Sequence, residues 1–321
     1  MILFVKLFSR TDPKCKSRDL MGFIPRILLR GVSLKRIKMK LQYLIATVIF
    51  LVAITTSSFA QTTDLVQLKN TEQFVLKSDY FKEEPFTIEV CLPKNYDPAK
   101  SYPVVYLLDA DKSIGMAKDI GDWLMWGKQI QDIIIVGIAY DKDDNTWWIN
   151  RSRDYLPTSD TITEFGKAFP KAGGGDNFLD FIQFTLVPEI NKRYSVNSSE
   201  TGIIGFSFGG TLATYALFTR PELFKNFMII SPGLSWDNSL ILTIEKEFYQ
   251  DHKTLNKKVF ISISSDDPEV EVKSPTTIFI DNMIDRDYKG LDFIHEYFEN
   301  ETHPSGYPRA ITTGLSKIYA R

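Results

Sequence analysis

The chain has 321 residues, 44% of them hydrophobic, and its 38 basic and 40 acidic side chains give a net charge of −2. This balance argues against a basic nucleic-acid-binding protein, and the length is ample for a buried core. Two cysteines and three scattered histidines leave little material for a disulfide framework or a zinc site.

Residues 1–60 have the composition of an export leader. Met39 and Lys40 precede the apolar run 41–54, and small residues ending in Ala60 follow it. A basic start, an apolar core and small residues in this order predict a signal peptide over 39–60, cleaved after Ala60. Met39 begins an intact signal by itself, so we interpret residues 1–38 as a start assigned too far upstream. A long n-region and a retained anchor are the alternatives, the latter disfavoured by the short apolar run.

Removal of the leader changes the charge and the cysteine count. Residues 1–60 hold 11 of the basic and 2 of the acidic side chains, so residues 61–321 carry 27 and 38, a net charge of −11. An acidic protein has no general attraction for nucleic acid or anionic membranes, and we expect neither as a partner. Cys15 leaves with the leader, so Cys91 has no intramolecular disulfide partner.

Residues 61–321 read as one domain. Alternating patterns predict strands at 73–78, 85–93 and 291–298, and continuous apolar runs predict buried strands at 104–108, 133–139, 202–205, 227–230 and 259–263. Helical patterns lie at 113–131, 177–193, 209–218, 238–249, 275–288 and 307–319. Buried strands that alternate with helices predict an α/β fold, with a mostly parallel sheet, helices on both faces and an antiparallel beginning.

The stretch 141–176 is predicted to be a long irregular loop. Its Trp147, Trp148, Arg151 and Arg153 are candidates for the wall of a substrate cleft. Packing of the tryptophans on the sheet, and ion pairs of the arginines with Asp154 or Asp160, are the alternatives.

Two further sequence features, a pair of tryptophans and a run of three glycines, are not assigned a role in binding or catalysis. Trp123 and Trp126, three apart on a predicted helix, are expected to pack in the core. The glycines at 173–175 lack the Lys-Ser/Thr of a phosphate-binding loop, so no nucleotide cofactor is expected.

The pentapeptide Gly205-Phe206-Ser207-Phe208-Gly209 lies between an apolar β-branched run and a helical pattern. This is the setting of a nucleophile elbow, where flanking glycines make room for a sharp turn from strand to helix. The pattern predicts Ser207 as a nucleophile, with an ordinary Gly/Ser turn as the alternative.

A serine nucleophile needs a histidine base and an orienting acid. His303 lies in a turn-rich loop after the last predicted strand, whereas His252 lies in a polar stretch and His295 inside a strand. We therefore predict His303 as the base. The loop after strand 259–263 offers the acid, and Asp267 is favoured over Glu269 and Asp266; an acidic turn without a catalytic role is the alternative.

An acyl-transfer site also needs two backbone N–H donors for an oxyanion. The residue after the nucleophile, Phe208, supplies one. The loop after strand 104–108 is expected to supply the other, from Ala110 or Asp111.

Several motifs resemble the putative-esterase family, which includes enterochelin esterases, S-formylglutathione hydrolase, feruloyl esterases and mycolyltransferases. They are the segments 102–109, 151–158, 174–182, 205–210 and 231–236 and the late His303. The resemblance implies an α/β-hydrolase fold, Ser207 as nucleophile, His303 as general base and Asp267 as acid. It adds Trp236 to the cleft candidates. The sequence departs from the family at Phe206, often histidine, and at Ala110, often glycine.

The leading interpretation is a secreted or periplasmic serine esterase that acts on a small-molecule ester, such as a siderophore, aryl or sugar ester, without metal or cofactor. Acyl transfer by the same residues is one alternative. A non-catalytic protein that binds a siderophore or glycan is another, but it would have no need of Ser207, Asp267 and His303 together.

The leader yields a direct prediction. Exported protein is expected to begin at Gln61, because the small residues before it are the recognised cleavage signal. Intact-mass and N-terminal mass spectrometry of the exported protein checks this. A mature N-terminus upstream of Met39 would contradict both the cleavage site and the start site.

Overall fold

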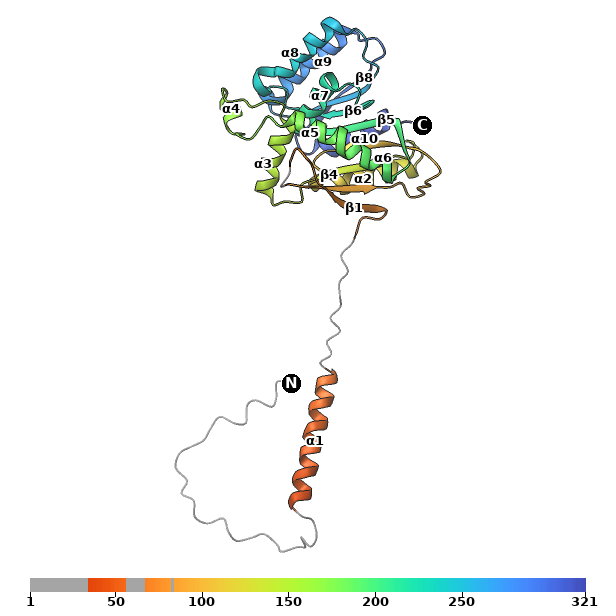
Figure 1. Cartoon of the computed structure of the whole chain (residues 1–321), viewed down its shortest axis with the longest axis vertical. Helices are drawn as coiled ribbons and strands as arrows, with labels where there is room; N and C mark the ends of the chain where they lie inside the picture. Colours follow the sequence, from red (N-terminus) through yellow and green to blue (C-terminus); the bar gives the residue numbers. More distant parts are fainter. Residues whose placement is uncertain (1–33, 56–66, 82–83) are drawn as a thin grey trace. The chain divides into compact units, whose positions relative to one another are not determined.

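The computed structural model describes residues 34–55, 67–81 and 84–321 (Figure 1). The chain divides into two units, residues 1–66 and residues 67–321. In the first, helix α1 (Leu34–Thr55) covers the apolar run predicted as the signal core. Residue 60, the predicted cleavage point, lies outside the described residues. Within these ranges, no helix has the length and apolar character needed to cross a membrane.

The second unit is built on one eight-stranded sheet in the order β1-β2-β4-β3-β5-β6-β7-β8. The strands are β1 (Thr71–Leu76), β2 (Phe86–Cys91), β3 (Tyr102–Leu107), β4 (Ile134–Ala139), β5 (Val196–Phe206), β6 (Asn226–Ile230), β7 (Lys258–Asp266) and β8 (Asp292–Thr302). The β1–β2 and β2–β4 pairs are antiparallel and all others are parallel. The predicted mostly parallel sheet with an antiparallel beginning is therefore confirmed.

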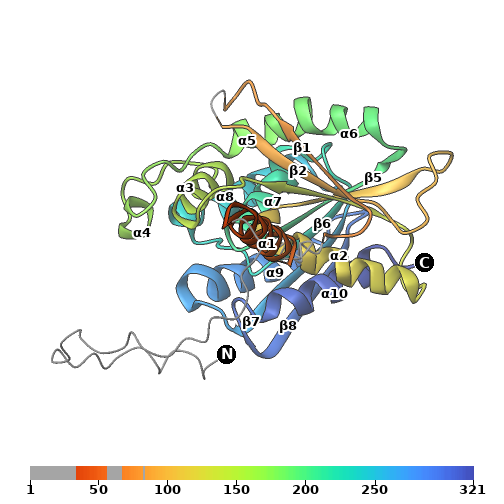
Figure 2. The same cartoon turned by 90° about the horizontal axis from the view of Figure 1, so that it is seen from below.

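Helices cover both faces of this sheet (Figure 2). Helices α2 (Ala110–Trp126) and α10 (Gly306–Ile318) pack on one face. The other face carries α3 (Asp144–Tyr155), α5 (Gly175–Phe181), the π-helical turn η1 (Ile182–Leu186), α6 (Val187–Arg193), α7 (Phe208–Thr219), α8 (Trp236–Asp251) and α9 (Ser274–Arg286). Two short elements complete the unit, α4 (Glu164–Lys167) and η2 (Glu269–Lys273). The central strands are buried on both sides, which explains their continuous apolar sequences.

The stretch 141–176 is not irregular throughout, since it holds α3 and α4. The carboxylate of Asp143 caps α3 by accepting hydrogen bonds from the N–H groups of Asn145 and Thr146, both at 3.1 Å. The apolar periodicity of a helix is missing because the buried face of α3 is largely polar and includes Arg151 and Asp154. The sequence prediction failed here because it depended on apolar spacing.

The prediction that Trp123 and Trp126 pack in the core is wrong. They are 69% and 71% exposed, and their rings stack on each other with centroids 4.9 Å apart. Helix α2 turns Ile114, Ala117 and Leu124 toward the sheet instead, which leaves the tryptophans on its outer face.

Cys91 lies at the end of β2, buried between the sheet and α2. Burial raises the pKa of its thiol to about 11. The thiol is therefore almost wholly protonated at neutral pH.

The contact between β4 and α2 yields a prediction about stability. A Cβ at Gly137 would lie 2.7 Å from Ala110 Cβ and 2.8 Å from Ile114 Cδ1. Gly137→Ala should therefore lower the free energy of unfolding by about 1–3 kcal/mol through overpacking. Urea denaturation measures this.

Gly115→Ala is the matched control, because Gly115 lies inside α2 with nothing within 4 Å of its ideal Cβ. It should raise the free energy of unfolding by up to about 1 kcal/mol through helix propensity. Equal midpoints for Gly137→Ala and wild type would show that α2 does not press on β4 at this point.

Candidate active site

The candidate residues gather where the parallel strands end. Ser207 follows β5, Asp267 follows β7 and His303 follows β8. Because β5, β6, β7 and β8 run parallel in neighbouring positions, their carboxyl ends form one edge. This edge is where open α/β sheets place their ligand sites.

The turn at Ser207 is strained. Its backbone has φ 57° and ψ −117°, a conformation that side-chain-bearing residues rarely adopt. A Cβ at Gly205 would lie 2.0 Å from the carbonyl oxygen of Gly209, so only glycine fits there. The turn is anchored by the N–H of Ser207, which donates to the carbonyl of Ile230 at 2.9 Å. Phe208 begins α7, so its N–H has no acceptor within that helix.

His303 and Asp267 are in direct contact. His303 Nδ1 lies 2.5 Å from Asp267 Oδ1. Because a carboxylate oxygen accepts, Nδ1 is the donor in this bond, and in the neutral imidazole Nε2 is then an acceptor. The other Asp267 oxygen accepts hydrogen bonds from Ser231 Oγ at 2.7 Å and from the N–H of Ser264 at 2.6 Å. The carboxylate is therefore fixed on both oxygens, and its side chain has no exposed surface.

The other two acid candidates do not contact His303. Glu269 is exposed and bonds to Lys273 and Ser274, and Lys273 holds the pKa of Glu269 below its usual range. Asp266 is exposed at the end of β7. Of the three carboxylates, Asp267 is the one that faces the histidine.

Phe206 connects the serine turn with the histidine. Its ring lies 4.5 Å from the His303 ring and stacks on Tyr307, also at 4.5 Å. Among the described residues, no hydrogen bond joins Ser207 Oγ to His303 Nε2. Such bonds are often long in unliganded structures and shorten when substrate binds.

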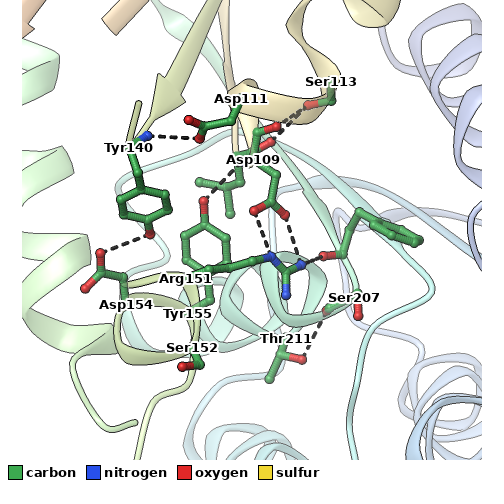
Figure 3. A network of polar contacts seen from close by, with 12 residues as sticks. Asp109, Asp111, Ser113, Tyr140, Arg151, Ser152, Asp154, Tyr155, Ser207 and Thr211 are labelled. Carbon is green, nitrogen blue, oxygen red and sulfur yellow. Dashed lines mark hydrogen bonds and ion pairs between the residues drawn. The ribbon is translucent and has the colours of Figure 1, made fainter. Parts of the chain in front are cut away.

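A buried ion pair that the sequence did not predict lies beside the turn (Figure 3). Arg151 donates to both carboxylate oxygens of Asp109, at 2.7 and 2.9 Å, and to the carbonyl of Phe206 at 2.9 Å. Burial raises the pKa of Asp109, and the charge of Arg151 opposes that rise. The remaining guanidinium nitrogen, Nη1, is buried without a partner within the described part of the chain. One sequence feature could have indicated this ion pair: Asp109 is an acidic residue that directly follows the predicted buried strand 104–108.

Aromatic rings surround Phe208 on the side of the turn facing α3 and α4. Its ring stacks on Trp148 at 5.7 Å and meets Phe169 at 5.1 Å, with Phe165 and Trp236 at 6.2 and 6.4 Å. Trp148 and Phe165 are 44% and 37% exposed, whereas Trp236 is buried. The sequence selected Trp148 and Trp236 for this wall but not the two phenylalanines.

The other cleft candidates have different surroundings. Trp147 is half-buried and lies 5.4 Å from the Arg151 guanidinium. Arg153 pairs with Asp154 and Glu84, so it forms the Asp154 ion pair that the sequence left open. Burial raises the pKa of Asp154 to about 6.

The candidates for the second oxyanion donor open helix α2. Ala110 is its first residue and is buried. The carboxylate of Asp111 accepts from the N–H groups of Tyr140 and Asp141, at 2.9 and 2.7 Å. The side chain of Asp111 thus holds the end of β4. Within residues 34–55, 67–81 and 84–321, no group of three His, Cys, Asp or Glu side chains is arranged to hold a metal ion.

An eight-stranded, mostly parallel sheet with a serine elbow and a carboxylate-bound histidine at its carboxyl edge defines an α/β-hydrolase. The chain belongs to the putative esterase family, whose profile matches residues 78–272. It is a carboxylic ester hydrolase.

Individual relatives agree with this assignment. The ferri-bacillibactin esterase of Bacillus subtilis is 29% identical over 198 residues, 59% of this chain and 68% of that protein. The siderophore triacetylfusarinine C esterase of Aspergillus fumigatus is 29% identical over 198 residues, 59% of this chain and 64% of that protein. A crystal structure of an IroE-like serine hydrolase from Shewanella oneidensis superposes with a TM-score of 0.69 at 29% identity, over 78% of this chain and 80% of that one. The chain thus spans about two thirds of the length of the two curated relatives.

The contact between Asp267 and His303 generates a prediction about the acid. Asp267→Asn should preserve the fold and lower kcat for ester hydrolysis by about 10³ to 10⁴, because an asparagine favours the wrong imidazole tautomer. Steady-state kinetics on a p-nitrophenyl ester, with circular dichroism as the folding check, measure this.

Glu269→Gln and Asp266→Asn are the matched controls and should be mild, since neither side chain contacts His303. A large loss confined to Glu269 would place the acid two residues later. Small effects at all three positions would indicate a Ser–His pair that works without an acid.

Proposed function

We propose that this protein is an exported serine esterase that cleaves small-molecule esters through an acyl-Ser207 intermediate. The observation that carries the proposal is the Asp267–His303 hydrogen bond beside the strained Ser207 turn. A buried, fixed carboxylate, an imidazole with a free Nε2 and a serine at the adjoining strand end form the set that nucleophilic acyl transfer requires.

In the first half of the proposed reaction, His303 Nε2 takes the proton of Ser207 as its oxygen attacks the ester carbonyl. The tetrahedral intermediate then collapses, and the imidazolium gives its proton to the departing alcohol. In the second half, water attacks the acyl-serine with His303 again acting as base, and the acid product leaves. Asp267 remains ionised and stabilises the imidazolium.

The developing oxyanion needs donors that are already in place. The N–H of Phe208 is the first donor of the proposal, and the backbone of Ala110 or Asp111 is the second. Arg151 is buried and acts on the site only through the turn, because it donates to the carbonyl of Phe206, the residue before the nucleophile.

The proposed substrate is a bulky ester with aromatic or polycyclic parts, with siderophore esters first among the candidates. Two observations support this choice. The wall of Trp148, Phe165 and Phe169 offers partly exposed ring faces beside Phe208. Two relatives are named as a ferri-bacillibactin esterase and a siderophore esterase. Aryl esters and sugar esters are the other candidate substrates.

We also propose that the esterase works outside the cytoplasm, as a secreted or periplasmic protein. The leader over 39–60 supports export, and no stable membrane anchor is proposed after cleavage.

The test of this function is hydrolysis of a panel that contains short p-nitrophenyl esters, feruloyl and acetylated sugars, and a catecholate trilactone. Ser207→Ala should remain folded and lose activity by about three orders of magnitude or more, because the covalent route disappears. Mass spectrometry of wild type mixed with a slowly deacylating ester should find the acyl group on Ser207.

Near-wild-type turnover by Ser207→Ala would refute the assignment of the nucleophile. Wild-type protein that transfers acyl groups to an added alcohol faster than to water would show an acyltransferase. Tight binding of the panel without turnover would show a binding protein.

A further inference from the structure

Residues 156–173, which we name the aromatic flap, form a loop closed at its own base. The carbonyl of Leu156 accepts hydrogen bonds from the N–H groups of Gly173 and Gly175, at 3.1 and 3.3 Å. Gly173 has φ 110°, so glycine is needed where the loop closes. The flap carries α4, which lies at the periphery of the unit in Figures 1 and 2.

The flap touches the catalytic turn through two rings. Phe165 and Phe169 both contact Phe208, and both also meet Trp236, at 5.9 and 6.1 Å. These contacts join the flap to the residue after the nucleophile. A shift of the flap would therefore change the aromatic wall without touching Ser207 or His303.

Hydrogen bonds of Thr158 with Asp237 and Trp236 tie the base of the flap to the start of α8. Thr158 Oγ1 donates to Asp237 Oδ2 at 2.7 Å. Beside it, Trp236 Nε1 donates to the carbonyl of Thr158 at 3.1 Å. Thr158 and Asp237 are 79 residues apart in the chain, so this pair joins two segments that are distant in sequence.

The backbone around Asp237 is strained. Asp237, Asn238 and Ser239 have φ values of 50°, 53° and 58°, three consecutive left-handed residues, none of them glycine. Left-handed residues with a side chain cost roughly 1–2 kcal/mol each and occur singly as a rule. A right-handed start of α8 would remove this cost but would redirect the Asp237 carboxylate. Strain of this kind persists where the surrounding structure over-determines it, and it clusters at functional sites.

We propose that Asp237 is a positioning residue that holds the aromatic flap against Phe208 and so selects for bulky aromatic esters. The inference rests on the proposed esterase function and adds a determinant of substrate size to it. Asp237 touches no reacting atom. Its effect reaches the substrate through Thr158, the flap and the rings of Phe165 and Phe169.

The experiment compares a large and a small acyl group on the same leaving group, p-nitrophenyl benzoate and p-nitrophenyl acetate. Asp237→Ala and Thr158→Val should each raise KM for the benzoate by about five- to tenfold, the factor expected for the loss of a hydrogen bond with a net contribution of about 1 kcal/mol. The kcat/KM for the acetate should stay within about twofold of wild type, because a small acyl group does not reach the wall. The double variant should be no worse than Thr158→Val alone, because Thr158→Val already removes the bond to Asp237.

Two matched controls separate position from strain. Thr158→Ser keeps the hydroxyl and should behave as wild type. Asn238→Gly relaxes the left-handed turn while Asp237 stays, so it should raise the melting temperature and leave both KM values unchanged. An Asn238→Gly variant that discriminates against the benzoate as Asp237→Ala does would overturn the role of the carboxylate.

A second readout does not depend on ester turnover. Lys167 and Lys171 are exposed on the flap, and trypsin cleaves after lysine. Release of the flap should speed cleavage at these sites by about tenfold in Asp237→Ala and Thr158→Val, in step with the larger open population. Unchanged cleavage would overturn the inference even if every ester is hydrolysed as proposed. Faster cleavage in a protein that hydrolyses no ester would instead support the role of the Thr158–Asp237 contact in holding the flap. It would refute the proposed esterase function, on which the selection for bulky esters rests.

Discussion

The buried pair of Asp109 and Arg151 is the interaction on which the rest of the site depends. It joins the end of β3, the helix α3 and, through the Phe206 carbonyl, the backbone that leads into the serine turn. Two charges taken out of water gain little net stability, but loss of one partner typically costs about 3–5 kcal/mol. The pair therefore acts mainly by excluding other arrangements of α3. The buried face of α3 is largely polar, so hydrophobic contact alone would not fix the position of this helix.

Several residues with left-handed backbone conformation lie at the same edge of the sheet. Asp109, Ser207, Ser231 and Asp237 all have positive φ, and each belongs to the site or its walls. Such residues cost about 1–3 kcal/mol each and need a rigid surrounding to persist. The sheet supplies that rigidity, since its central strands are fully buried between two layers of helices. Stability in the core is thus what permits the unfavourable geometry at the edge.

The fold could be predicted from the sequence wherever burial decides local structure. Central strands are apolar because both faces are covered, and Gly205 is required because a Cβ there would lie 2.0 Å from the carbonyl oxygen of Gly209. The helix α3 was not predicted, because its buried face is largely polar and gives no apolar periodicity. The core positions predicted for Trp123 and Trp126 were wrong, because these large apolar side chains are exposed. The sequence narrowed the acid to three neighbouring carboxylates. Only the contact with His303, from a loop 36 residues away, separates Asp267 from the others.

The state of Cys91 implies that the second unit, residues 67–321, responds little to the redox potential of its surroundings. It is the one cysteine in the described part of the chain, it is buried, and its high pKa leaves almost no thiolate to attack a disulfide. Thiol exchange proceeds through the thiolate, so folding of this unit needs no disulfide-forming enzyme and no isomerase. The same property should spare it from covalent dimers and from mixed disulfides with small thiols, whether the solution around it is reducing or oxidising.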